Sequence, residues 1–306
     1  MNVSTILFSS GHELDLAPEA FGQVVRSDHL LGQPAALQEQ LDAEGYLFIP
    51  GFFNRELIDD ARASLTGRLA AGGLLDPSAP TMEARVRPGT LSPVPADIAL
   101  RNPELDRVIH GPELLKFYAM LFGESVRHYD FTWLRAVAPG RGSPAHCDLV
   151  YMGRGTHQVL TCWIPYGEVP LELGGLIVLE GSHRQSARLK NYLESDVDRY
   201  CENRPAELER VKVLGGWSHR HNGSLTTNPV SLREKLGGRW LTTHWRPGDL
   251  ITFKMNLVHA SLDNQTDSIR LSSDTRYQRA SQPIDPRWVG ENPPGHGPRA
   301  KVGMVC

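Results

Sequence analysis

The sequence predicts a mainly β protein with flanking helices, in which the strands form an antiparallel sandwich or barrel. Helical patterns come first, at about residues 34–123, and from residue 125 the chain changes to short β-type runs separated by turn residues. Several brief strands at such spacing favour antiparallel pairing over strand–helix–strand units. These runs read HYDFTWLRAVAPG, LVYMGRG, HQVLTCWIPYG, GGLIVLEGSH, GDLITFKMNLVHAS and IRLSSDTRYQ.

The helical part begins with LQEQLDAEGYLFIPGFF, which predicts a short helix that ends near Gly45 and leads into a strand at 46–49. A second helix is expected at about 56–69. Because Asn54 lies just before it, the Asn54 side chain can cap the first turn. A third helical pattern, GPELLKFYAMLFG, carries Pro112 where a proline suits the first turn of a helix.

The organisation of the chain favours a single domain. Its 306 residues, 40% hydrophobic and 22% charged, are enough for one large domain with a full core. No internal repeat appears, and no proline- or glycine-rich linker separates compositionally different halves. We therefore expect one domain over 1–306 with an insertion at about 185–240. Within it, 187–211 is expected to be helical and 215–229 to be a polar loop.

The composition excludes several classes of partner. A formal net charge of −3 with both signs interspersed offers no basic face for nucleic acid, so a small-molecule substrate is expected. No apolar stretch approaches the roughly 20 residues of a membrane helix, and no basic leader precedes the first apolar run, so a cytoplasmic protein is expected. The oligomeric state stays open. The cysteines lack disulfide- or zinc-type spacing and are expected to be reduced: Cys147, Cys162, Cys201 and Cys306.

The segment GSPAHCDLVYMG places His146 and Asp148 one residue apart. In an extended strand, residues two apart point to the same face, so this pair is predicted to project together while Cys147 points away. An imidazole nitrogen and a carboxylate oxygen make half of a divalent metal site. The spacing alone is weak, because with 12 histidines a chance pair is expected, and His128 and Asp130 form a second one.

Downstream residues distinguish the first pair from the second. His146 follows a Gly/Pro turn, and His259 lies at the end of an apolar segment as a third candidate ligand. Two histidines and one carboxylate on a β-barrel form the facial triad of non-haem Fe(II) oxygenases, which leaves three coordination positions open. Arg270, eleven residues later, is suited to hold the distal carboxylate of a cosubstrate through two parallel hydrogen bonds.

The order of these motifs resembles the phytanoyl-CoA dioxygenase family of Fe(II)- and 2-oxoglutarate-dependent oxygenases. The resemblance rests on His146-x-Asp148, then GGLIVLEGSHR and PGD, then His259-x-Ser261, and finally Arg270. It extends over about 125–280, and more weakly through AEGYLFIPGFFNRELID near the N-terminus. Jointly the motifs are specific, although singly none is.

The resemblance implies a double-stranded β-helix, which is a jelly-roll, cupin-like barrel. It implies Fe(II) on His146, Asp148 and His259, with O2 as the oxidant. It further implies that Arg270 binds 2-oxoglutarate, with Ser261 and Trp163 lining the cosubstrate pocket. The expected reaction oxidises, most simply hydroxylates, an unidentified small organic substrate with release of succinate and CO2.

Some choices stay open at the level of sequence. Family members carry a further basic residue, well upstream of the first metal histidine, that contacts the cosubstrate. Here Arg85 or Arg87 could serve, Arg135 lies nearer, and the choice among the three stays open. Tyr151, Met152 and Arg154 after the first ligand pair are expected to border the substrate pocket, but they indicate no substrate, and desaturation or another oxidation remains an alternative outcome. Alternative functions are a cupin-like metalloenzyme that does not use 2-oxoglutarate and a non-catalytic barrel that only binds a ligand.

Overall fold

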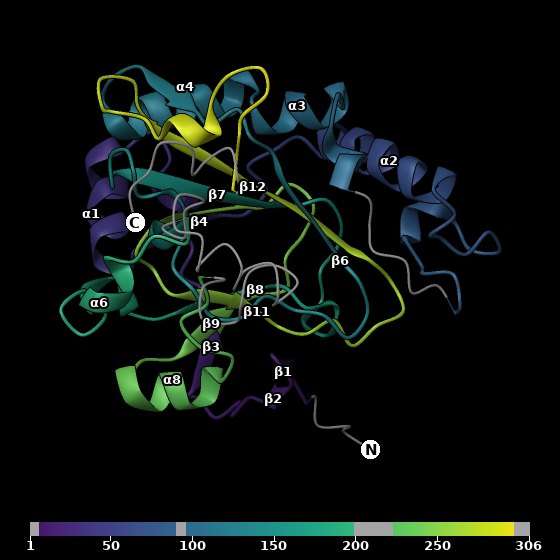
Figure 1. Ribbon diagram of the computed structural model, residues 1–306, viewed down its shortest axis with the longest axis horizontal. Coiled ribbons are helices and arrows are strands. Elements are labelled where there is room, and N and C mark those ends of the chain that lie inside the picture. The colour runs from purple at the N-terminus through teal and green to yellow at the C-terminus, as the bar shows by residue number, and fades with distance from the viewer. Residues whose placement is uncertain (1–5, 90–95, 199–222, 297–306) are drawn as a thin grey trace, which may run out of the picture.

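The structure, a computed structural model, describes residues 6–89, 96–198 and 223–296. Its larger sheet is antiparallel and follows the order β4–β10–β7–β12–β5, with β6 paired to β12 beside β5 (Figure 1). The strands are β4 (Tyr46–Ile49), β5 (Val126–His128), β6 (Trp133–Val137), β7 (Val159–Pro165), β10 (Leu250–Lys254) and β12 (Arg270–Arg279).

The smaller sheet follows the order β11–β8–β9–β3. Its strands are β3 (Phe21–Gln23), β8 (Leu176–Leu179), β9 (Trp240–Thr242) and β11 (His259–Ser261). Pairing is antiparallel except between β3 and β9. Side chains from both sheets meet in one buried apolar cluster that includes Trp163 and Phe253 from the larger sheet and Val178 and Leu241 from the smaller one. The two sheets therefore share an interior, as the predicted sandwich or barrel requires.

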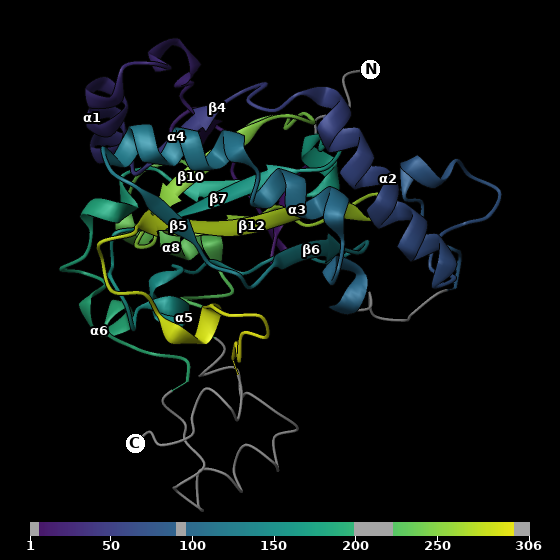
Figure 2. The same cartoon turned by 90° about the horizontal axis from the view of Figure 1, so that it is seen from above.

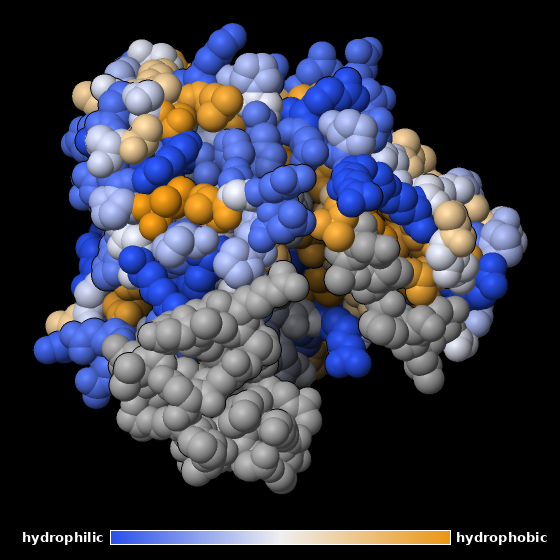
Figure 3. All heavy atoms as spheres, turned by 45° about the horizontal axis from the view of Figure 1, so that its top comes forward, coloured by the Kyte–Doolittle hydropathy of each residue, from blue (hydrophilic) through white to orange (hydrophobic). Residues whose placement is uncertain are grey.

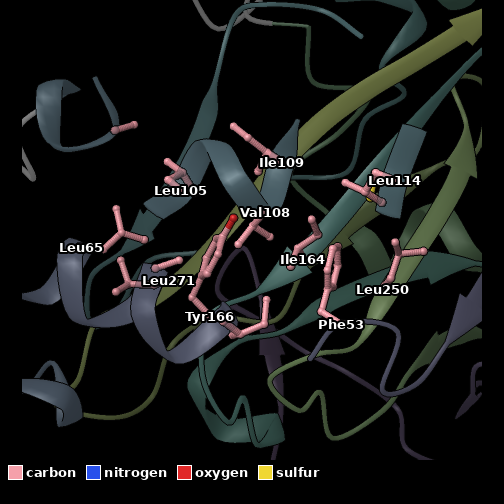
Figure 4. Packing of buried hydrophobic residues seen from close by; sticks show 14 of the residues in the cluster. Phe53, Leu65, Leu105, Val108, Ile109, Leu114, Ile164, Tyr166, Leu250 and Leu271 are labelled. Carbon is pink, nitrogen blue, oxygen red and sulfur yellow. The ribbon is translucent and has the colours of Figure 1, made fainter. Parts of the chain in front are cut away.

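Four helices cover the outer face of the larger sheet (Figures 1 and 2). They are α1 (Pro34–Glu44), α2 (Arg55–Ala71), α3 (Pro103–Ile109) and α4 (Pro112–Phe122). Figure 4 shows the packing between them, with Leu65 of α2, Val108 of α3 and Leu114 of α4 gathered against strand residues such as Ile164. The helices and β4 confirm the expected N-terminal elements. The Asn54 side chain accepts a hydrogen bond from the Glu56 N–H at 2.8 Å, as its predicted capping role requires.

Shorter elements complete the described chain. The hairpin β1 (Phe8–Ser9) and β2 (His12–Glu13) and the helix α8 (Pro229–Leu236) pack on the outer side of the smaller sheet. The remaining α-helices within the described ranges are α5 (Leu149–Met152) and α6 (Lys190–Leu193). Six short 3₁₀ helices lie at Asp28–Leu30, Thr81–Glu83, Ala96–Ala99, Leu171–Leu173, Ser182–Arg184 and Pro286–Trp288.

Two sequence expectations need correction. The run LVYMGRG does not form a strand, because 149–152 is the helix α5. Of the helix expected at 187–211, the described part contains only α6, and 199–211 lies outside the described residues. The expected loop 215–229 is described from residue 223, and its last residue, Pro229, begins α8.

One face of β12 contributes apolar side chains to the core, and the other carries buried charged residues. Leu271 and Tyr277 point outward into the helix-covered core, where the Tyr277 ring stacks on Tyr118 of α4 at a centroid distance of 4.2 Å. Since neighbouring strand residues point to opposite faces, Arg270 and Arg276 point to the interior. An interior strand face that carries buried charges indicates a functional centre in that region.

One face of the protein carries mainly polar side chains. On the face shown in Figure 3, hydrophilic residues predominate and apolar ones form separate patches. Among the described ranges, no helix is both long and apolar enough to cross a membrane.

Gly45 provides a test of the packing around α1. It caps α1 with a φ of 81°, and a Cβ added there would lie 2.5 Å from Nδ1 of His183, whereas Gly32 has a φ of 83° and open space around it. Gly32→Ala is expected to lower the free energy of unfolding by about 1 kcal/mol through backbone strain alone. Gly45→Ala should cost about 1–3 kcal/mol more, because it also overpacks against His183. Urea denaturation of both variants measures the difference, and equal losses would show that His183 moves aside freely.

Candidate metal centre

His146 and His259 are neighbours because their backbones form an antiparallel bridge. Each N–H donates to the other residue's carbonyl oxygen at 2.9 Å, which joins the segment before α5 to the start of β11. Asp148 differs from the sequence expectation, since it is not in an extended strand. Its φ of −65° and ψ of −23° are helical, and it directly precedes α5. The Asp148 and His146 side chains still converge, and Cys147 is buried in an apolar cluster away from them.

The three candidate ligand atoms lie within 4.8 Å of one another. Oδ1 of Asp148 is 3.7 Å from Nε2 of His146 and 3.6 Å from Nε2 of His259. The two imidazole rings are 4.2 Å apart between centroids. Among the residues that the structure describes, no fourth histidine, cysteine or carboxylate joins this group. Three protein ligands with no fourth leave a bound metal open to other molecules.

Both imidazoles are held in the orientation that a metal requires. Nδ1 of His146 lies 2.8 Å from the Pro144 carbonyl oxygen, and Nδ1 of His259 lies 3.0 Å from the Leu257 carbonyl oxygen. Because a carbonyl oxygen only accepts hydrogen bonds, each Nδ1 carries the proton and each Nε2 presents a lone pair. Burial lowers the pKa of His146 to about 3, with a further contribution from His259, so His146 is neutral at physiological pH.

Asp148 is held by two donors on the larger sheet. Its Oδ2 accepts hydrogen bonds from Oγ1 of Thr161 in β7 and from Nη2 of Arg276 in β12, the latter at 2.8 Å. Burial raises the pKa of the Asp148 carboxyl group. Arg276, the two imidazoles and Thr161 together lower it by more, so the pKa lies well below its usual range. Asp148 is therefore an anion, and its Oδ1 is left to face the imidazoles.

Arg270 is a buried cation that lacks a paired carboxylate in the described part of the chain. Only 2% of its surface is exposed, and burial lowers its pKa to about 10. Its one hydrogen bond is a long one, 3.4 Å from Nη1 to Oγ of Ser272, and its Nε finds no partner among the described residues. Since a buried charge without a counter-ion is costly, this guanidinium is prepared to receive an anion.

Trp163 and Ser261 lie beside these charged groups. The Trp163 ring centroid is 5.9 Å from Cζ of Arg270, and its ring packs edge-on against Trp245. Ser261 follows His259 by two residues in β11, and its Oγ accepts a 2.7 Å hydrogen bond from the Ser143 N–H. This bond ties β11 to the turn that precedes His146. The Ser261 hydroxyl proton stays available for another acceptor.

The three arginines left open by the sequence have different surroundings. Arg85 is exposed and pairs with Glu83 and Asp267, and Arg87 is also exposed. Both border a surface pocket of about 750 Å³. Arg135 instead lies on β6, pairs with Asp274 at 2.7 Å, and exerts an electrostatic influence on His146. Of the three, Arg135 is the one associated with the triad.

Sequence reasoning missed Thr161 and Arg276. Neither belongs to a recognisable motif, but the alternation of side-chain directions along their strands could have indicated both residues. Arg276 follows Arg270 by six residues and Thr161 precedes Trp163 by two, so each shares a face with a residue already singled out.

The donor set fits a divalent metal and an anionic cosubstrate. Two imidazoles and one carboxylate suit Fe(II), and three ligands on one side of the metal would leave positions for a chelating ligand. The buried guanidinium of Arg270 supplies the charge and the fork geometry that a second carboxylate of that ligand would need.

Comparison with known proteins identifies both curated relatives and solved structures that are similar to this chain. The curated relatives include 1-deoxypentalenic acid 11-beta-hydroxylases from Streptomyces exfoliatus, 26% identical over 82% of this chain and 83% of that protein, and from Streptomyces arenae, 25% identical over 86% and 87%. Among solved structures, the epimerase SnoN in complex with Fe3+, alpha ketoglutarate and nogalamycin RO aligns with a TM-score of 0.53 at 22% identity, covering 87% of this chain and 96% of that one.

A second solved structure, EctD from S. alaskensis with 2-oxoglutarate and 5-hydroxyectoine, aligns with a TM-score of 0.52 at 20% identity and covers 95% of this chain and 90% of that one. These two structures share the fold. The family model described as Phytanoyl-CoA dioxygenase (PhyH) matches residues 41–272, which is most of the chain. This protein therefore belongs to the phytanoyl-CoA dioxygenase family of iron- and 2-oxoglutarate-dependent oxygenases.

Proposed function

We propose that this enzyme hydroxylates a small organic substrate, with His146, Asp148 and His259 as the iron ligands and Arg270 as the anchor of 2-oxoglutarate. The observation that carries the proposal is the convergence of three ligand atoms within 4.8 Å, with both Nδ1 atoms tied to backbone carbonyls. The curated relatives are hydroxylases, which favours this outcome over desaturation or other oxidations.

We also propose that the two sheets close into a double-stranded β-helix. The apolar cluster shared by both sheets supports it, as does the backbone bridge between His146 and His259. His146 and His259 lie at the β11 edge of the smaller sheet, and Asp148 contacts β7 and β12 of the larger sheet, so residues from distant parts of the chain could share one metal.

Bound Fe(II) with 2-oxoglutarate and O2 supplies the oxidation, in which the keto acid yields succinate and CO2 and one oxygen atom is inserted into a substrate C–H bond. The protein's own residues prepare this step. The two Nε2 lone pairs and Oδ1 of Asp148 would hold the metal, and the Arg270 guanidinium would bind the distal carboxylate of 2-oxoglutarate. Trp163 forms an apolar wall beside that carboxylate, and Ser261 offers its hydroxyl proton.

Arg135 is proposed as the upstream basic residue of the cosubstrate site. Its side chain keeps 39% of its surface exposed although it pairs with Asp274, so it can reach a second anion. Arg85 and Arg87 are not favoured, because both are exposed and Arg85 is already paired with surface carboxylates.

The substrate is proposed to have an apolar body. Aromatic rings lie close to the triad, since Tyr151 packs edge-on against His146 at 5.6 Å between centroids. Trp133 packs against Phe131, and Cζ of Arg276 lies 4.2 Å from the Trp133 ring centroid. The curated relatives are named for hydroxylation of 1-deoxypentalenic acid, so this acid and other organic acids with an apolar body are the first compounds to test.

Iron-dependent turnover of 2-oxoglutarate tests the proposed function directly. Protein purified without oxygen should bind one Fe(II) per chain and, once O2 is added, form succinate slowly even without substrate. His259→Ala should weaken Fe(II) binding by more than about 100-fold, because a ligand contributes more than the 10–100-fold of an outer-shell partner.

His244→Ala is the matched control, since His244 is half-exposed and pairs with Glu168. Calorimetric titration with Fe(II) and a succinate assay provide the readouts. Iron-loaded protein that never consumes 2-oxoglutarate with any candidate substrate would favour the cupin-like alternative, and protein without affinity for iron would favour the binding protein.

Removal of Arg270 should separate cosubstrate binding from metal binding. Arg270→Gln is expected to raise KM for 2-oxoglutarate by about 100-fold, which corresponds to two lost charge-assisted hydrogen bonds at about 1.5 kcal/mol each. Its Kd for Fe(II) should change by less than about threefold. Equal losses in both constants would contradict the assigned role. In the same assay, Arg135→Gln should weaken 2-oxoglutarate binding, whereas Arg85→Gln and Arg87→Gln should not.

A further inference from the structure

The two oxygens of the Asp148 carboxylate have separate surroundings. Oδ1 faces the imidazoles, 3.7 Å from Nε2 of His146 and 3.6 Å from Nε2 of His259. Oδ2 is turned toward the larger sheet, where it accepts hydrogen bonds from Thr161 and Arg276. With both donors in place, Oδ2 is occupied and Oδ1 alone is directed at the metal position.

Oδ2 of Asp148 and the Arg276 guanidinium form an unusually buried ion pair. Only 1% of the Arg276 side chain and 2% of the Asp148 side chain are exposed, and Nη2 and Oδ2 are 2.8 Å apart. A second carboxylate, on Asp274, lies 3.8 Å from Nη2 but is already bound by Arg135 at 2.7 Å. The Trp133 ring covers the Arg276 guanidinium at 4.2 Å. Arg276 is therefore fixed from several sides with Asp148 as its nearest anion.

Burial of this pair has little value as a source of stability alone. Taking both charges out of water costs about as much as their attraction returns, so apolar residues of similar volume would serve the core equally well. Moreover, Nε and Nη1 of Arg276 lack partners within the described ranges, which adds to the cost. A role at the metal centre would account for an ion pair that the stability of the core does not require.

The coordination mode of the carboxylate determines how many positions the metal keeps open. A carboxylate can bind a metal through one oxygen or through both. With one oxygen from Asp148, the triad leaves three positions, two for the keto acid end of 2-oxoglutarate and one for O2. With both oxygens, one of these positions is lost.

We propose that Arg276, assisted by Thr161, is a positioning residue that holds Asp148 in one-oxygen coordination and so keeps the position for O2 open. This inference rests on the proposed function. It assigns to Arg276 a task distinct from that of Arg270, although both arginines lie on the same face of β12. Arg270 governs the affinity for 2-oxoglutarate, and Arg276 governs access of O2 to the metal.

Nitric oxide, which binds Fe(II) where O2 would, measures this access without turnover. Anaerobic protein loaded with Fe(II) and saturating 2-oxoglutarate is titrated with nitric oxide, and the iron–nitrosyl complex is followed by electron paramagnetic resonance. Arg276→Met removes the charge and the donor, and it is expected to weaken nitric oxide binding by about tenfold, equivalent to about 1.4 kcal/mol. The Kd values for Fe(II) and 2-oxoglutarate should stay within about threefold of those of the wild type.

Further variants separate positioning from general structural damage. Arg276→Lys keeps a charged donor and should restore most of the nitric oxide affinity. Thr161→Val preserves side-chain shape, removes the second donor and should show a smaller loss in the same direction, so it decides the question if Arg276→Met does not fold. Arg279→Met is the control on the same strand, because Arg279 lies over Phe122, away from the triad.

Unchanged nitric oxide affinity in both Arg276→Met and Thr161→Val would overturn the proposal. Loss of Fe(II) binding in Arg276→Met would also overturn it, since Arg276 would then be needed for the ligand set itself. A wild-type protein that gives no iron–nitrosyl signal would instead defeat the proposed function on which the inference rests.

Discussion

The backbone bridge between His146 and His259 is the constraint on which the site depends. Two reciprocal hydrogen bonds of 2.9 Å join residues that lie more than a hundred positions apart in the chain. The bridge fixes both Cα positions, and the contacts of each Nδ1 with a carbonyl two residues earlier fix the rings. The turn into α5 then brings Asp148 to them. Backbone pairing thus brings the candidate ligands together without a metal, which would reduce the ordering cost of metal binding.

Strand β12 complements this bridge with charge. Its outward residues join the apolar core under the helices, while its inward residues place two arginines and one aspartate in the interior. Arg276 pairs with Asp148, Asp274 pairs with Arg135, and Arg270 keeps no anion of its own in the described part of the protein. The charges of Arg276 and Asp274 are therefore compensated within the protein, and the charge of Arg270 is available for a bound anion. A chelating dianion would complete the pattern, because it meets a divalent ion at one end and Arg270 at the other.

Local sequence signals predicted much of the fold and the three candidate ligands, but not the groups that act through them. The β4 strand, the Asn54 cap and the brief antiparallel strands each have a pattern within a few residues. The helix at 149–152 does not, because its four residues resemble a strand and its conformation depends on contacts such as the bond from the Leu149 N–H to the Met255 carbonyl. Thr161 and Arg276 were missed because they contact the side chain of a candidate ligand, Asp148, and not the metal position itself, and the pairing of β7 with β12 brings them together there.

The most direct test of the account is the structure of crystals soaked without oxygen in Fe(II) and 2-oxoglutarate, with the iron located by anomalous scattering. We expect one iron peak in contact with Nε2 of His146, Nε2 of His259 and Oδ1 of Asp148. We also expect the far carboxylate of 2-oxoglutarate to lie on Arg270. Iron bound elsewhere, a fourth protein ligand, or a cosubstrate directed away from Arg270 would contradict these expectations.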